Sequence, residues 1–133
     1  MTQPLLPILL LLAVEYTGVI LAVLADLVTG LSHSRREGVP LTSKRLRHTV
    51  EKLKSYLGAL LLVTLVDAMI IAASLGLKSC GADGFAPFPY LSTAGAIGLA
   101  LIEVKSMLEN MPNRADLRRA ARLVTSLKKL LKL

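Results

Sequence analysis

The chain has 133 residues, of which 53% are hydrophobic and only 19% are charged, and its formal net charge is +7. This composition is too apolar for an ordinary soluble domain of that size, and no segment alternates apolar and polar residues as a half-exposed strand would. The single cysteine, Cys80, excludes an internal disulfide and a multi-cysteine metal site, while the positive charge suits an anionic membrane surface or a nucleic acid. We therefore expect an all-α membrane protein with one membrane domain over residues 1–133.

The first apolar stretch covers residues 5–31 and contains two charged residues, Glu15 and Asp26. Roughly 20 helical residues cross the hydrocarbon core of a bilayer, so this stretch is long enough to span it even when tilted. A cleaved signal peptide is a poor interpretation, because residues 1–4 contain no Lys or Arg. The pattern predicts a retained transmembrane helix.

A polar and mostly basic segment follows over residues 33–54. Gly38 and Pro40 predict a turn, and the hydroxyl of Ser43 or of the residue before it can cap a new helix. From that cap, apolar residues recur at helical spacing on one side, with basic residues around the rest of the circumference. This predicts a basic amphipathic helix over residues 43–55 that lies on a membrane surface and then turns inward.

The second and third predicted spans cover residues 57–77 and 89–111. Asp67 is the only charged residue in the second, and the purely apolar part of the third ends at Glu103. The loop between them is rich in Gly, Pro and small residues, and its aromatic residues stand where a headgroup-level belt is expected. The sequence thus predicts three transmembrane helices.

The C-terminal segment, residues 113–133, predicts a second basic amphipathic helix. Its apolar residues follow alternating spacings of three and four, and every charged residue from Arg118 onward is positive. A solvated coiled-coil helix is one interpretation, but the uniform charge favours binding to anionic lipid. The residues expected to contact lipid headgroups from the two basic segments are Arg35, Arg36, Lys44, Arg45, Arg47, Arg118, Arg119, Arg122, Lys128 and Lys129.

Lys and Arg are distributed unevenly along the chain. Seven lie between the first two spans and seven after Pro112, whereas the loop between the second and third spans has one and the N-terminal segment has none. The positive-inside rule therefore predicts that the N-terminus lies outside and that both basic segments and the C-terminus are cytoplasmic.

Carboxylates inside the apolar stretches are the most informative residues. An ionised carboxylate is costly in hydrocarbon, so each should face other helices or water, or be protonated. Glu15 and Asp26 are 11 positions apart, about three helical turns, so they share a face, and small residues lie between them on it. The candidate pore-lining or helix-packing residues are Glu15, Gly18, Ala22, Asp26, Thr29, Thr64, Asp67 and Glu103.

Two interpretations of these polar faces stay open. In the first they line an aqueous path in an oligomer, because three helices alone cannot enclose a wide channel. In the second they only pack against each other, with the acids bonded to hydroxyl groups or paired with Lys105 or a lipid headgroup.

No enzyme motif is visible, since the chain has neither a Gly-rich phosphate loop nor a nucleophile elbow. We therefore expect no catalytic residue and no cofactor. His33 and His48 have no ligand cluster near them, so no metal site is expected. The basic segments lack the aromatic residues and fold signatures of nucleic-acid binding, so no nucleic-acid partner is expected.

The order of several short motifs resembles that of the holins of phage lysis and toxin secretion. The residues that carry the resemblance are Asp26, Thr29 and Gly30 at the end of the first span, Ser43 and Lys52 before the second, Asp67 within it, and Glu103, Glu109 and Asn110 at the end of the third. The resemblance covers roughly residues 26–110, which is most of the chain.

The resemblance implies a bacterial inner-membrane protein that forms homo-oligomers and opens lesions through which a cell-wall hydrolase or toxin leaves the cytoplasm. The endolysin would act downstream without direct contact, and the basic segments would hold each subunit against the anionic inner leaflet. Alternatives are an antiholin-type regulator, a membrane adaptor that recruits a cytoplasmic partner through its tail, a small ion or proton channel, and a soluble helical bundle.

Overall fold

The computed structural model describes residues 5–40, 43–110 and 114–131. Within these ranges the chain forms four α-helices and contains no strand. Three of the helices are long and apolar enough to cross a membrane. The expected fold class, all-α with three membrane-spanning helices, is therefore confirmed.

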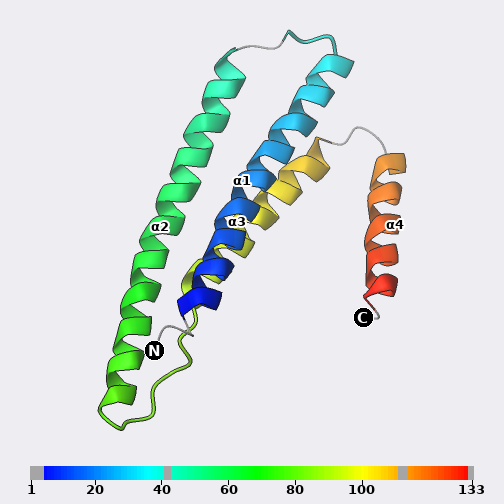
Figure 1. Ribbon diagram of the computed structural model, residues 1–133. Coiled ribbons are helices and arrows are strands. Elements are labelled where there is room, and N and C mark those ends of the chain that lie inside the picture. The colour runs from blue at the N-terminus through cyan, green and yellow to red at the C-terminus, as the bar shows by residue number, and fades with distance from the viewer. Residues whose placement is uncertain (1–4, 41–42, 111–113, 132–133) are drawn as a thin grey trace.

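The three long helices form an up-down-up bundle (Figure 1). They are α1 (Leu5–Arg36), α2 (Ser43–Ser79) and α3 (Tyr90–Glu109), and α1 packs most extensively on α3. The fourth helix, α4 (Arg114–Leu130), lies beside the bundle rather than within it (Figure 1). It is the predicted amphipathic tail helix, although the ends of the predicted segment lie outside the described residues.

The first helix extends beyond the predicted span and stops at a glycine. Leu31 was the expected end of the span, but α1 continues to Arg36, which gives a helix of 32 residues or about 48 Å. Gly38 then adopts a left-handed conformation with φ of 69°, and the amide of Val39 donates to the carbonyl of Ser34 at 3.0 Å. This hydrogen bond satisfies a carbonyl group that the helix end would leave unpaired.

The second helix is continuous over 37 residues, from Ser43 to Ser79. The predicted basic segment 43–55 and the predicted span 57–77 therefore share one axis, and the expected turn between them is absent. The physical reason is that no Pro or Gly interrupts residues 43–57, so nothing in that stretch ends the helix. At about 55 Å, α2 is much longer than the roughly 30 Å hydrocarbon core.

The exterior of the bundle is apolar and its core is small. Among the described residues, Val19, Val23, Leu60 and Ala96 are the buried hydrophobic side chains, and dozens of larger ones are exposed on all three helices. In water such a surface would be a severe aggregation liability. In lipid it is the expected condition, since hydrocarbon solvates these side chains as well as a protein core does.

The loop between α2 and α3 is held close to the end of α2. The hydroxyl of Ser74 donates to the carbonyl oxygen of Phe85, and Pro89, which directly precedes α3, is buried. Gly84 lies so near α2 that a Cβ atom there would be 2.6 Å from the carbonyl oxygen of Ser74. Only glycine fits this approach without moving the backbone.

We predict that Gly84→Ala lowers the free energy of unfolding of the detergent-solubilised protein by about 1–3 kcal/mol, because the added methyl group overlaps backbone atoms of α2. Gly58→Ala is the matched control, since a Cβ at position 58 meets nothing within 4 Å and alanine favours the helix. Thermal unfolding followed by circular dichroism measures both variants. Equal stability of the two would contradict the close approach at Gly84.

Candidate functional site

The polar side chains of the bundle interior gather in two layers with an apolar layer between them. We call them the Asp67 layer, near the loop between α2 and α3, and the Lys52 layer, near the turn between α1 and α2. The layers are about 16 Å apart, because Ser92 and Glu103 are 11 residues apart on α3. Both layers therefore fit within the thickness of one hydrocarbon core.

Asp67 is the centre of its layer and is 1% exposed. Its Oδ1 accepts from the backbone amide of Leu91 at 3.0 Å, and its Oδ2 accepts from the amide of Ser92 at 2.6 Å and from the Ser92 hydroxyl at 2.7 Å. All three donors belong to the first turn of α3. A carboxylate on α2 thus binds the start of the neighbouring helix.

The first turn of α3 needs such an acceptor. The N-cap position is occupied by Pro89, whose side chain makes no capping hydrogen bond. The first amides of a helix have no partner within the helix, and in hydrocarbon no water replaces one. The carboxyl oxygens of Asp67 supply the missing acceptors at the positive end of the helix dipole.

Two further contacts complete this layer and join α1 to the other helices. The hydroxyl of Thr93 donates to Oε1 of Glu15, whereas Oε2 of Glu15 is buried without a partner. The hydroxyls of Tyr16 and Thr64 lie 3.0 Å apart. Because Thr64 donates its proton to the carbonyl of Leu60 at 2.7 Å, Tyr16 is the donor in this pair.

An apolar layer separates the two polar ones. It is formed by Val19 of α1, Leu60 of α2 and Ala96 of α3, with exposed fractions of 2%, 0% and 5%. Tyr16 and Tyr56 pack against its two sides. This layer leaves no continuous polar path through the interior of one subunit.

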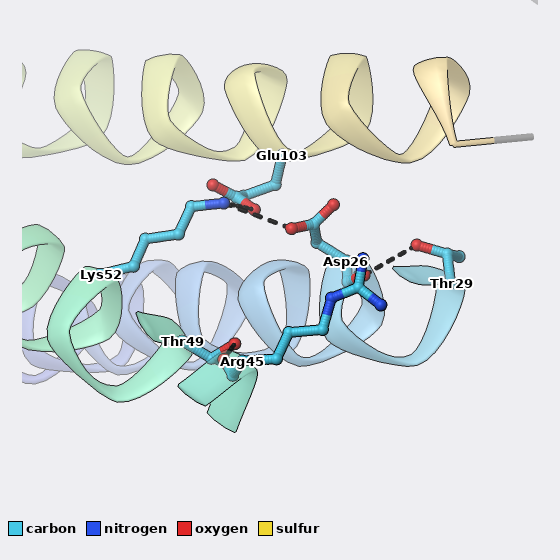
Figure 2. Close-up of polar contacts among 6 residues, drawn as sticks. All are labelled: Asp26, Thr29, Arg45, Thr49, Lys52 and Glu103. Atoms are coloured by element: carbon cyan, nitrogen blue, oxygen red, sulfur yellow. Dashed lines mark hydrogen bonds and ion pairs between the residues drawn. The ribbon is translucent and has the colours of Figure 1, made fainter. Parts of the chain in front are cut away.

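In the Lys52 layer each of the three helices contributes one charged side chain (Figure 2). The ammonium group of Lys52 lies 2.7 Å from Oε2 of Glu103 and 3.3 Å from Oδ2 of Asp26. Glu103 is fully buried, while the Lys52 and Asp26 side chains are about one-fifth exposed. The ring of Tyr56 lies 5.8 Å from the ammonium and adds a cation–π contact.

The charges of this layer do not balance, because two carboxylates share one ammonium. Oδ1 of Asp26 and Oε1 of Glu103 are both buried without a hydrogen-bond partner. Beside them is a polar cavity of about 200 Å³, lined by Asp26, Lys52 and Arg45 among others. A cavity of this size holds several water molecules, which can serve the unpaired oxygens.

Arg45 continues the polar interior towards the end of α1. Its Nη1 donates to the carbonyl of Gly30 at 3.0 Å and to the hydroxyl of Ser34. Arg45 and Asp26 both line the polar cavity beside the Lys52 layer. One arginine therefore ties the first turn of α2 to the last turns of α1.

The structure brings together only part of the predicted packing set. Glu15, Asp26, Asp67 and Glu103 all face the interior, and Thr64 reaches it through Tyr16. Gly18 is exposed on the outer side of α1, Ala22 is half-buried, and the Thr29 hydroxyl bonds the Asp26 carbonyl of its own helix. Whether any of these residues lines a pore stays a prediction.

The sequence does not reveal which residues form hydrogen bonds or ion pairs with the acidic side chains. Lys105, the partner considered for them, instead lies 3.8 Å from Glu109 on its own helix. The sequence pattern assigns Lys52 to a surface segment. It does not identify Ser92 as the partner of Asp67 or Thr93 as the partner of Glu15. A signal for Lys52 existed, because it is one of the residues that carry the family resemblance.

Apart from Asp67, the other motif residues lie near the same end of the bundle. Gly30 is buried against Arg45, Ser43 begins α2, and Asn110 caps the end of α3. The basic residues predicted to contact headgroups are exposed, apart from Arg119, whose side chain lies outside the description. Arg45 is exposed and also contacts α1 through Gly30 and Ser34. Their contact with lipid stays a prediction.

Comparison with known proteins gives one match. The family model described as the bacteriophage holin family matches residues 9–132. No curated protein and no solved structure matched the chain. The match covers α1 from residue 9 onward, all of α2 and α3, and both polar layers.

We predict that Lys52→Met destabilises the solubilised protein by about 3–5 kcal/mol, because it leaves the carboxylates of Asp26 and Glu103 buried without a cation. Lys54→Met is the matched control, since Lys54 is exposed on the same helix. Adding Asp26→Asn and Glu103→Gln to the first variant should restore most of the stability, as measured by thermal unfolding. Failure of this rescue would show that the layer is not held by its charges.

We predict that Asp67→Ala exposes the amides of Leu91 and Ser92 to hydrogen exchange and costs about 1–3 kcal/mol, because both amides lose their acceptor. Asp67→Asn keeps one acceptor oxygen and should have a smaller effect. Asp83→Ala, in the exposed loop, serves as the control. Unchanged protection at both amides in Asp67→Ala would refute the capping role.

Proposed function

The chain belongs to the bacteriophage holin family, and from this premise we propose that it oligomerises in the bacterial inner membrane and permeabilises it. The lesion would release a cell-wall hydrolase or another exported protein from the cytoplasm. The observation that carries the proposal is the family match combined with three helices whose apolar surfaces are almost entirely exposed.

The geometry of a single bundle supports assembly into an oligomer. Its interior is filled by the Lys52, apolar and Asp67 layers, so one subunit encloses no passage for a protein. A lesion therefore has to form between subunits, where exposed helix faces meet. Gly18 supports such a contact, because it faces away from the bundle and small residues allow helices to approach closely.

Charge supports one orientation of the chain. Seven Lys and Arg residues, including the interior Lys52, lie between the first two predicted spans and seven lie after Pro112, whereas the loop between α2 and α3 has none and the last turn of α2 has one, Lys78. The positive-inside rule then places the N-terminus outside and α4 in the cytoplasm, where both basic segments meet the anionic inner leaflet. The hydrolase would act downstream of the lesion without touching this chain.

A second candidate function is a small ion or proton channel. It is favoured by the buried and unpartnered oxygens of Glu15, Asp26 and Glu103, which are unusual in a purely structural bundle. The two functions differ in what crosses the membrane. A channel passes ions alone, whereas a holin lesion passes folded protein.

We predict that induced expression in bacteria collapses the membrane potential, stops growth and releases a co-expressed cytoplasmic hydrolase that has no export signal. Gly18→Leu should delay or abolish the release, because the bulky side chain keeps subunits apart while leaving the bundle intact. Ala13→Leu is the matched control on another exposed face of α1. Potential is followed with a voltage-sensitive dye and release by the fall in culture turbidity.

Depolarisation without hydrolase release would favour the ion channel instead. Full growth and an intact potential at high expression would contradict both functions and point to an antiholin-type regulator or an adaptor.

A further inference from the structure

A hollow of about 710 Å³ opens where α1 ends and α2 begins. We call it the basic hollow, after Lys44, Arg45, His33 and His48, which line it together with Glu37 and the apolar pair Val39 and Pro40. It is adjacent to the Lys52 layer, since Arg45 and His48 also line the smaller cavity there. The end of α3 contributes Asn110 to both spaces.

The two cations of the basic hollow have no anionic partner in the part of the chain that the structure describes. No carboxylate lies within ion-pair distance of Lys44 or Arg45. The one carboxylate of the lining, Glu37, is already engaged, because its Oε1 lies 3.4 Å from Nε2 of His33. The other ring nitrogen of His33, Nδ1, is buried and has no partner.

Arg45 is fixed in position before any ligand arrives. Its Nη1 is held by the Gly30 carbonyl and the Ser34 hydroxyl, so its remaining N–H groups are left to donate elsewhere. A guanidinium group in a fixed orientation suits the paired oxygens of a phosphate, and it loses little side-chain entropy on binding. Lys44 adds a second positive charge at the rim.

The position of the hollow indicates which kind of phosphate-bearing molecule binds there. Ser34 is eight residues beyond Asp26, or about 12 Å along α1, so the hollow lies at the level where the helices leave the hydrocarbon. Phospholipid phosphates are concentrated at this level, and basic pockets between membrane helices commonly hold anionic headgroups. The exposed side chain of Val39 adds an apolar rim that a free phosphate would not use.

We infer that the basic hollow is a discrete binding site for the phosphate of an anionic glycerophospholipid. The inference rests on the proposed anchoring to an anionic leaflet, but it adds a defined site to what diffuse charge would give. Because Arg45 also joins α2 to α1 beside the Lys52 layer, a bound lipid becomes part of the packing at this end of the bundle.

Native mass spectrometry of the solubilised full chain tests the site. The chain is titrated with phosphatidylglycerol, phosphatidylcholine and inorganic phosphate, and the wild type should retain one phosphatidylglycerol most tightly. Lys44→Gln with Arg45→Gln should weaken that binding by about tenfold, since both charge-assisted contacts are lost. Lys54→Gln with Lys78→Gln removes the same charge from the same helix outside the hollow and should leave the binding within about twofold.

Circular dichroism checks that each variant keeps its helices. If the Arg45 variant does not fold, Lys44→Gln alone decides, because Lys44 has no ion-pair partner in the described chain; we expect about threefold weaker binding. Equal losses in the two double variants would overturn the site in favour of diffuse charge. Equal binding of phosphatidylcholine or inorganic phosphate would overturn the lipid assignment. The measurement needs no membrane lesion, so failure of the proposed permeabilisation leaves it unaffected.

Discussion

The ion pairs of Lys52 with two carboxylates are the interaction on which the arrangement of the bundle depends. Each of the three helices supplies one member, at Asp26, Lys52 and Glu103, and the Lys52 ammonium lies within 3.3 Å of both carboxylates. A charge left alone in hydrocarbon costs several kcal/mol, so sliding one helix by a turn would separate all three groups at once. The layer thus fixes the register of the helices even though their apolar contacts are few.

The helices depend on polar rather than apolar contacts for their register because the surrounding solvent is lipid. Lipid tails solvate leucine as well as another helix does, so apolar burial gives little preference for one packing over another. Polar contacts and close approach by small residues then decide which packing of the helices forms. In the apolar layer Ala96 packs beneath Leu60, and a Cβ at Gly95 would already lie 3.7 Å from that leucine. The Asp67 and Lys52 layers above and below it supply the specificity.

The fold could be predicted from the sequence much further than the site. Length and hydropathy reveal three spans, because a stretch of apolar residues is a local property of the chain. The acidic residues that face the interior could also be predicted, since a carboxylate in an apolar helix is costly in hydrocarbon unless it faces other helices or water. Their partners could not, because the pairing of Lys52 with Glu103 depends on how two helices cross.

The error at Lys52 has a definite cause. The residue stands in the basic segment 43–55, whose amphipathic pattern is typical of a helix on a membrane surface, so the pattern does not predict an interior position for it. The continuity of α2 brings it instead beside α1 and α3, next to Tyr56. The capping of α3 by Asp67 was hidden for a similar reason, since capping is normally sought within a few residues of the helix start.

That capping arrangement restricts how the protein enters the membrane. The first amides of α3 are paired by an oxygen on α2, so α3 cannot leave water alone without carrying unpaired donors into the lipid. The Asp67 contact satisfies these donors only when the second and third helices lie in the bilayer together as a hairpin.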